Sequence, residues 1–245
     1  MKTKNIANLE GFTGAILIPV FETSPQNLVP IEFHGVAVSS KVFYGKKDTY
    51  YMAEKYDCVH IFIGLGKKID YKSLKTITRR IASKEKETFG KNVALVIPEV
   101  FTLQQVEATV SGLFLGTYNL GHFKKKINHA FLDPKFELAL ISKTDHTEVV
   151  KRAIKIAKAQ IEILYLVDLP PNNVTPTYLS KWAIERGNTY GFSTRILDGE
   201  ASRIEGLDAF IAVGKGSDKE PQFIIMDYIP ETDIPKIRHV GLVGK

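Results

Sequence analysis

The feature that most constrains the fold of this chain is a regular alternation of short apolar runs with longer segments of helical periodicity. The apolar runs are rich in β-branched residues and are bounded by turn residues, as buried strands are. Four such runs lie in the first part of the chain, at residues 14–21, 58–66, 92–100 and 135–142. Strands and helices that alternate in this way predict an α/β fold with a largely parallel sheet.

The segments between these runs carry apolar residues at helical spacing. Leu74, Ile77 and Ile81 fall on one face of a helix within residues 70–90, and Gly90 is suited to its end. A second helix within residues 102–126 has the same pattern, at Val106, Val110 and Phe114.

A domain boundary is predicted where a long amphipathic segment meets two prolines. Pro170 and Pro171 end the helical pattern, because proline lacks an amide hydrogen and clashes with the preceding turn. We therefore expect an N-terminal α/β domain at 1–145, a linker helix at 146–169 and a second domain at 170–245. The apolar stripe of the linker helix comprises Val150, Ile154, Ala157, Ile161 and Leu164.

The second domain resembles the beginning of an α/β layer. Thr175 can cap a helix with Pro176 in its first turn, and Gly187 follows the expected end of that helix. Two strands are expected near residues 192–199 and 222–228, and a last short strand in the C-terminal HVGLVGK. No helix follows to cover that strand, so we expect the chain to be a fragment with an exposed apolar face that favours aggregation.

Composition narrows the class of protein. There is no apolar run of membrane-spanning length and no secretory leader, and Cys58 is the only cysteine, so a cytoplasmic protein without membrane association is expected. Residues 1–159 hold 24 Lys and Arg against 15 Asp and Glu, a net charge of +9, whereas residues 160–245 have a net charge of −3. The basic residues form no nucleic-acid motif and are interpreted as solvated surface, so a nucleic-acid partner is not expected. The densest are Lys124, Lys125, Lys126, Lys151, Arg152, Lys155 and Lys158.

Spacing alone gives no complete active site and no cofactor-binding residue. The glycine-rich segments 64–67 and 213–221 lack the full spacing of a phosphate-binding loop and are interpreted as turns without a ligand. His60 and Cys58 lie in an apolar run and are interpreted as core residues. The six histidines show no metal-binding spacing, and no catalytic pattern includes Asp168, Asp198 or Asp208.

The second domain resembles the leucyl aminopeptidase (cytosol aminopeptidase) family. Three stretches occur in the order and spacing of that family: LVDLPPNNVTPTYLSKWAIERG, GEASRIEGLDAFIAVGKGSDKEPQFIIMDY and HVGLVGK. The first domain is similar to the family's N-terminal domain through FIGLGKKIDYKSL and VEATVSGLFLGTYNLGHFKKK. The resemblance implies a macro-domain-like N-terminal α/β domain, followed by the start of an α/β di-metal aminopeptidase domain.

The resemblance assigns one site residue. In the family, V-G-K begins the motif V-G-K-G-x-x-F-D-[ST]-G-G, whose lysine binds metal, so Lys245 matches a metal ligand. The family hydrolyses N-terminal residues from peptides with two divalent metal ions, zinc or manganese, and forms hexamers. Neutralising a lysine at pH 7 costs roughly 4–5 kcal/mol, which a metal held by several carboxylates can offset. The other family ligands do not occur in residues 1–245, so we expect these residues alone to bind no metal and to be inactive.

Two other functions remain open on the sequence. The basic first domain could be a non-catalytic binding module for an anionic, ADP-ribose-like nucleotide, with the 64–66 turn as its cradle. Alternatively, the chain could be a regulatory subunit that caps intact aminopeptidase chains with its first domain.

Overall fold

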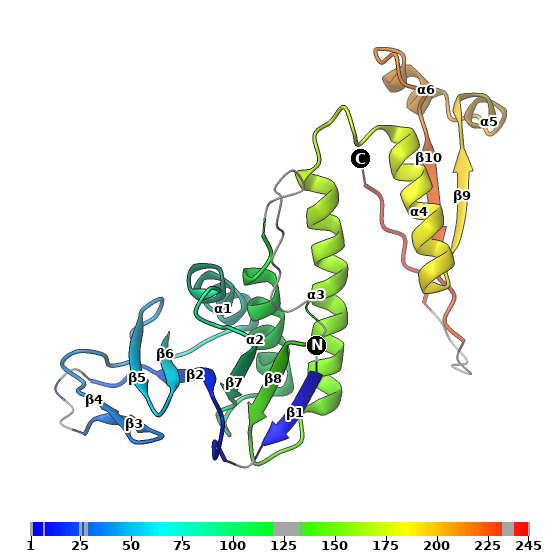
Figure 1. Cartoon of the computed structure of the whole chain (residues 1–245). Coiled ribbons are helices and arrows are strands. Elements are labelled where there is room, and N and C mark those ends of the chain that lie inside the picture. Colours follow the sequence, from blue (N-terminus) through cyan, green and yellow to red (C-terminus); the bar gives the residue numbers. More distant parts are fainter. Residues whose placement is uncertain are drawn as a thin grey trace. The chain divides into compact units, whose positions relative to one another are not determined.

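The computed structural model describes residues 2–6, 8–24, 26, 29–119, 133, 135–231 and 238–244. The chain divides into two compact units, Met1–Asp168 and Leu169–Lys245. Strands and helices alternate in both units, so the predicted α/β class is confirmed (Figure 1). None of the described helices combines the length and the hydrophobicity that crossing a membrane requires.

The first unit is built on a sheet in the order β1-β8-β7-β2-β6-β5. In this order, the first five strands are parallel to one another. The last strand, β5, pairs antiparallel with β6. The sheet is thus largely parallel, as predicted. Its strands are β1 (Lys2–Ile6), β2 (Gly14–Phe21), β5 (Tyr50–Lys55), β6 (Cys58–Gly66), β7 (Asn92–Val96) and β8 (Glu137–Ile141).

The two faces of this sheet have separate apolar cores, because side chains alternate along each strand. Leu17 on β2 and Ile63 on β6 belong to the core beneath the helices. Ile16 on β2 and Phe62 on β6 belong to the core on the opposite face. All four side chains are fully buried, so both faces of the central strands are covered.

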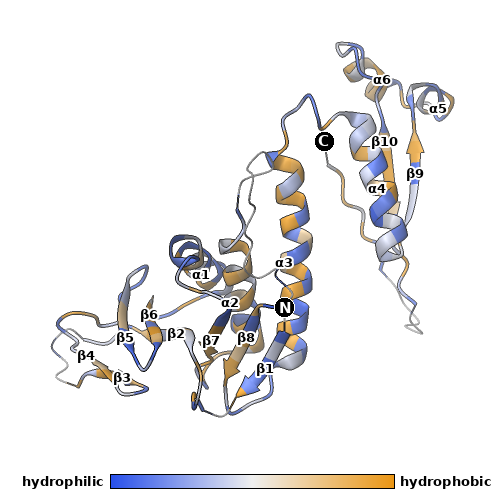
Figure 2. Cartoon of the chain, in the orientation of Figure 1, coloured by the Kyte–Doolittle hydropathy of each residue, from blue (hydrophilic) through white to orange (hydrophobic). Residues whose placement is uncertain are grey.

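Among the residues that the structure describes, three helices cover the first face: α1 (Tyr71–Glu85), α2 (Leu103–Gly116) and α3 (Thr147–Asp168). The predicted stripes on α1 and α2 are buried, and α2 is buried throughout 106–116. Along α3, Figure 2 shows hydrophobic and hydrophilic bands, and Val150, Ala153, Ala157 and Ile161 lie in the core with α2. Helix α3 therefore packs within the first unit and ends just before Pro170.

A small hairpin contributes to the core on the second face. Its strands, β3 (Ile31–Phe33) and β4 (Val36–Val38), pair antiparallel. Val36 and Val38 are buried in one cluster with Ile16, Ile18 and Phe62 of the sheet. The hairpin thus shields apolar residues that would otherwise meet solvent.

The described residues of the second unit, 169–231 and 238–244, form a strand pair and three helices. Strands β9 (Ser193–Leu197) and β10 (Phe223–Asp227) pair antiparallel. The helices are α4 (Pro176–Tyr190), α5 (Gly199–Ile204) and α6 (Asp208–Gly214). As predicted, Thr175 caps α4, since its side chain accepts a hydrogen bond from the backbone nitrogen of Tyr178 at 3.2 Å.

Two local predictions for this unit were wrong. Gly187 does not follow α4 but lies within it, where a Cβ would come 2.7 Å from the Phe192 carbonyl oxygen and the Thr194 hydroxyl. The helix ends instead at Gly191, in the left-handed conformation (φ 77°) that glycine adopts readily. Residues 238–244 form no strand, because an isolated segment without a paired neighbour lacks the hydrogen bonds that define one.

Candidate functional site

The predicted metal ligand, Lys245, lies outside the described residues. The segment that leads to it, 238–244, is exposed throughout, with Leu242 and Val243 almost fully accessible. In the part of the chain that the structure describes, no three His, Cys, Asp or Glu side chains are grouped so that they could hold a metal ion. The described residues therefore do not fit a two-metal centre, and no catalytic step is assigned to them.

The predicted glycine turn at 64–67 was wrong in position, because residues 64–66 are the end of β6 and the strand ends at Gly66. The backbone nitrogen of Gly64 donates to the Thr49 carbonyl at 2.8 Å, and that of Gly66 donates to the Gly45 carbonyl at 2.9 Å. A Cβ on Gly64 would overlap the Lys46 carbonyl oxygen. These bonds to residues 45 and 49 accompany the continuation of β6 through Gly66, past the predicted start of the turn.

The second glycine-rich segment, 213–221, begins in the last turn of α6 and leads towards β10. The backbone nitrogen of Ser217 donates to the Gly214 carbonyl at 3.1 Å, and the Ser217 hydroxyl accepts from the backbone of Lys219 at 3.0 Å. These are local turn bonds, so the structure agrees with the interpretation of this segment as a connection.

The three aspartates that no catalytic pattern includes lie at the ends of helices. Asp198 caps α5 by accepting a hydrogen bond from the backbone nitrogen of Ala201 at 2.9 Å, and Asp208 is in the first turn of α6. Asp168, the last residue of α3, accepts a hydrogen bond from the Tyr118 hydroxyl. The pKa of Tyr118 is raised above its ordinary value, first by burial and next by the hydrogen bond to Asp168.

The predicted basic face of α3 is partly neutralised by acidic neighbours. Lys151 pairs with Glu148 at 2.8 Å, and Arg152 pairs with Glu107 of α2 at 3.0 Å. Lys155 is exposed, and the run 124–126 lies outside the described residues. Two of the basic residues on this face are thus held in ion pairs, and the interpretation of the face as solvated surface stays a prediction.

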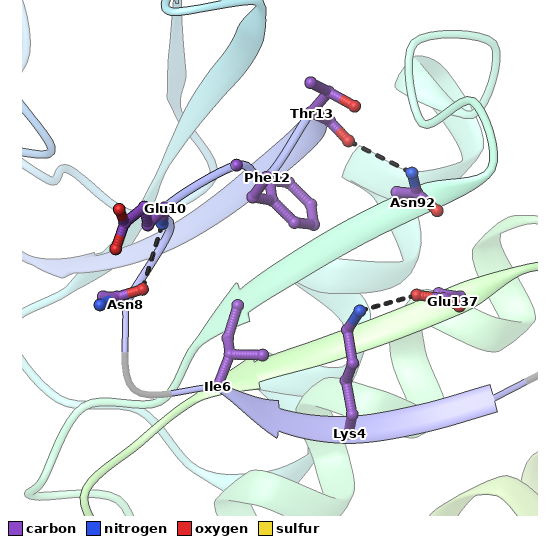
Figure 3. Close-up of a pocket in the computed structure, with 9 residues that line it drawn as sticks. Lys4, Ile6, Asn8, Glu10, Phe12, Thr13, Asn92 and Glu137 are labelled. Atoms are coloured by element: carbon purple, nitrogen blue, oxygen red, sulfur yellow. Dashed lines mark hydrogen bonds and ion pairs between the residues drawn. The ribbon is translucent and has the colours of Figure 1, made fainter.

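A hollow of about 370 Å³ lies at the amino-terminal ends of β7 and β8 (Figure 3). Lys4 and Glu137 line it and pair with each other at 2.9 Å, and the bond from Lys4 lowers the pKa of the Glu137 carboxyl. Asn92, also on its wall, donates to the Thr13 carbonyl at 3.4 Å. Ligands of parallel sheets bind at the opposite, carboxyl ends of the strands, and Glu10 leaves the lining with an excess of negative charge over Lys4. The hollow therefore does not support the nucleotide alternative.

Two histidines that are far apart in sequence meet in the first unit. Nδ1 of His34 lies 3.1 Å from Nε2 of His60, and the two rings stack with centroids 5.3 Å apart. His60 is fully buried on β6, as the sequence predicted for a core histidine. Cys58 on the same strand is also buried, and burial raises the pKa of its thiol. No sequence pattern indicated the histidine contact, because 26 residues separate the pair.

Comparison with known proteins identifies what the second unit is similar to. Residues 164–245 match the model of the cytosol aminopeptidase family, catalytic domain. A probable cytosol aminopeptidase of Microcystis aeruginosa is 30% identical over 190 residues, 76% of this chain and 38% of that protein. One of Sulfurihydrogenibium is 31% identical over 192 residues, 73% of this chain and 37% of that protein. The chain thus spans less than two fifths of the length of these curated relatives.

Solved structures show the same fold. A mutant of tomato leucine aminopeptidase superposes with a TM-score of 0.75 at 18% identity, over 95% of this chain and 52% of that one. The bottromycin maturation enzyme BotP, in complex with manganese, superposes with a TM-score of 0.68 at 18% identity, over 89% of this chain and 46% of that one.

Proposed function

We propose, on the premise that this chain belongs to the leucyl aminopeptidase (cytosol aminopeptidase) family, that it contributes to a hydrolase that removes N-terminal residues from peptides. The observation that carries this proposal is the match of residues 164–245 to the catalytic domain of the family. Relatives about 30% identical are described as probable cytosol aminopeptidases, which supports the same activity.

The proposed domain organisation follows that of the family. Residues 1–145 are the macro-like N-terminal domain, residues 146–169 the helix that joins the domains, and residues 170–245 the start of the peptidase domain. Peptides are the proposed substrates, the cytoplasm the proposed location, and a homo-hexamer the proposed assembly. Most of the active site is then supplied by residues that the family places after the V-G-K motif.

Lys245 is the one residue of this chain that we propose as a metal ligand. A lysine binds a cation only through its neutral amine, so it requires a neighbouring dication, zinc or manganese, held by other ligands. Two such ions would activate a water molecule and polarise the peptide carbonyl. Residues 1–245 alone are therefore proposed to be inactive.

The test combines intact mass with activity. We would purify the protein from its source cells, compare its mass with the 27.4 kDa of these residues, and assay hydrolysis of leucine p-nitroanilide with Mn²⁺ or Zn²⁺. The proposal expects activity in a heavier polypeptide and none in recombinant 1–245. A native protein of 27.4 kDa that is inactive with either metal would overturn it.

A matched pair of substitutions tests the role of Lys245 in the active protein. Lys245→Met removes the amine at similar length, and we expect hydrolysis to fall by more than a hundredfold. Lys219→Met removes an exposed lysine of the same unit and should leave the rate unchanged. Equal rates for the two variants would exclude Lys245 as a ligand.

A further inference from the structure

The histidine contact joins two tight turns of the first unit. The turn between β3 and β4 contains His34 and Gly35, with φ angles of 50° and 72°. The turn between β5 and β6 contains Tyr56 and Asp57, with φ angles of 54° and 56°. Two central residues with positive φ are the mark of a type I′ hairpin turn, which fixes the register of the strands on either side.

The two turns make several contacts with each other. The His34 ring lies edge-on to the Tyr56 ring, with centroids 5.4 Å apart. The Lys55 ammonium donates a hydrogen bond to the Gly35 carbonyl and lies 4.9 Å from the Tyr56 ring centroid. The stacked His34 and His60 rings complete the contact. Polar and aromatic contacts therefore hold the tip of the β3–β4 hairpin against the sheet.

The distance between the histidine nitrogens limits their protonation. At 3.1 Å, Nδ1 of His34 and Nε2 of His60 have room for one proton between them, donated by one ring and accepted by the other. If both rings are charged, both nitrogens carry protons that point at each other. His60 is fully buried, and its second nitrogen, Nδ1, has no hydrogen-bond partner. A charge on this ring would therefore be shielded from water, which disfavours the protonated form.

We propose that the His34–His60 contact is an acid-sensitive latch, which holds the β3–β4 hairpin on the sheet at neutral pH and releases it when both rings become protonated. The latch rests on the contact between His34 and His60 and does not depend on the proposed aminopeptidase function. It makes the exposure of one face of the sheet depend on pH.

The groups around His60 favour release in acid. His34 faces it from the β3–β4 turn and Lys55 from β5, and both add positive charge. Ile16 of β2 and Ala53 of β5, which are beside His60 in the sheet, are apolar. Asp57 and Tyr56 lie in the neighbouring turn, and Cys58 is on the same strand. Burial is the largest cause that lowers the pKa of His60, and the charge of His34 is the next; the backbone of Cys58 and of Ala53 raises it by less, so that the pKa stays below its ordinary value.

The sign of the pH effect follows from that lowered pKa. Between it and the ordinary histidine value of about 6.5, the open form binds more protons than the latched form. The latch is therefore fully stable above about pH 7, and its stability decreases as the pH falls through 6.5 towards the lowered pKa. Release would expose Ile16, Ile18 and Phe62, which are now buried in one cluster with the hairpin valines.

Hydrogen exchange of the full chain tests the latch. We would measure protection factors at pH 7.5 and pH 5.0 for residues 31–38 and, as an internal reference, for 92–96 of β7. Protection of 31–38 should fall at least tenfold at the lower pH, and that of 92–96 should not change. A fall in neither segment, or an equal fall in both, would overturn the proposal.

Substitutions assign the effect to the histidine pair. In His34→Gln, the amide can still bond to His60 but cannot be charged, so the pH-dependent fall should shrink at least threefold. His60→Phe should abolish it, and if that buried change prevents folding, His34→Gln decides alone, since His34 is only half-buried. His146→Gln, at a second buried histidine among the described residues of this unit, should keep the full effect. An undiminished fall in His34→Gln, or its loss in His146→Gln, would refute the latch.

Discussion

Arg152 on α3 places its Nε 3.0 Å from Oε2 of Glu107 on α2, and the two side chains differ greatly in exposure, at 72% and 11%. The Tyr71 hydroxyl on α1 donates to the other oxygen of the same carboxylate at 3.1 Å. Burial, and next the bond to Glu107, raise the pKa of Tyr71. One nearly buried carboxylate thus links the three helices that cover the sheet.

Replacement of Arg152 should destabilise the first unit. In Arg152→Ala the carboxylate of Glu107 keeps its bond to Tyr71 but loses its cation. We expect the free energy of unfolding, measured in urea, to fall by about 1 kcal/mol, since the lost partner is itself largely exposed. Lys151→Ala, which breaks the exposed pair with Glu148, should change it by less than about 0.5 kcal/mol. Similar losses in the two variants would show that the burial of Glu107 has no energetic effect.

Gly64 is expected to tolerate no side chain. In Gly64→Ala the new Cβ would overlap the Lys46 carbonyl oxygen and lie 2.7 Å from the Thr49 hydroxyl. Overpacking against backbone should cost about 2–3 kcal/mol in the free energy of unfolding. Gly216→Ala is the control, because its Cβ would meet no atom within 4 Å. An unchanged unfolding midpoint for Gly64→Ala would contradict the close approach of residues 45–49 to β6.

The start of α2 depends on a reciprocal cap. Thr102 accepts a hydrogen bond from the backbone nitrogen of Gln105 at 3.3 Å, and the Gln105 side chain accepts one from the backbone nitrogen of Thr102 at 2.9 Å. Thr102→Ala should lower the free energy of unfolding by about 1 kcal/mol, whereas Thr102→Ser, which keeps the hydroxyl, should lower it by less. Thermal unfolding followed by circular dichroism ranks the two variants, and equal losses would argue against the cap.

The bond between Tyr118 and Asp168 makes stability sensitive to high pH. Because the pKa of Tyr118 is raised in the folded chain, the folded chain keeps a proton that an unfolded tyrosine loses above about pH 10. This stabilisation is complete below pH 10 and decreases as the pH rises further. In Tyr118→Phe, the free energy of unfolding should therefore fall less between pH 9 and pH 11. In Tyr228→Phe, at an exposed tyrosine, the free energy of unfolding should fall as much as in the unmodified chain. A Tyr118→Phe profile parallel to the unmodified one would contradict the shift.

Sequence periodicity predicted the elements whose buried residues recur at helical spacing or form a continuous apolar run. Leu74, Ile77 and Ile81 lie at helical spacing and are buried, and the continuous apolar runs of β2 and β6 are central strands. In these segments local propensity and tertiary packing favour the same structure, so one-dimensional patterns were sufficient.

Features set by distant neighbours could not be predicted in this way. The edge strand β1 reads KTKNI and has little hydrophobic signal, because it pairs with the sheet on one side only. Gly187 was expected to end a helix, but a glycine is needed there because residues 192–194 lie too close to leave room for a side chain. The contact of His34 with His60 depends on the placing of a hairpin that no spacing rule describes. The predicted ligand Lys245 rests on family resemblance alone.

The position of β1 also bears on the order in which the chain is made. Lys4 pairs with Glu137, 133 residues later, and β1 has no other strand partner in the described sheet. A ribosome that adds about 5–20 residues per second needs roughly 7–27 s to bridge that interval. During translation the first strand must therefore wait, unpaired, until β8 has emerged. Its two lysines suit that delay, since charged edge residues oppose association with other nascent chains.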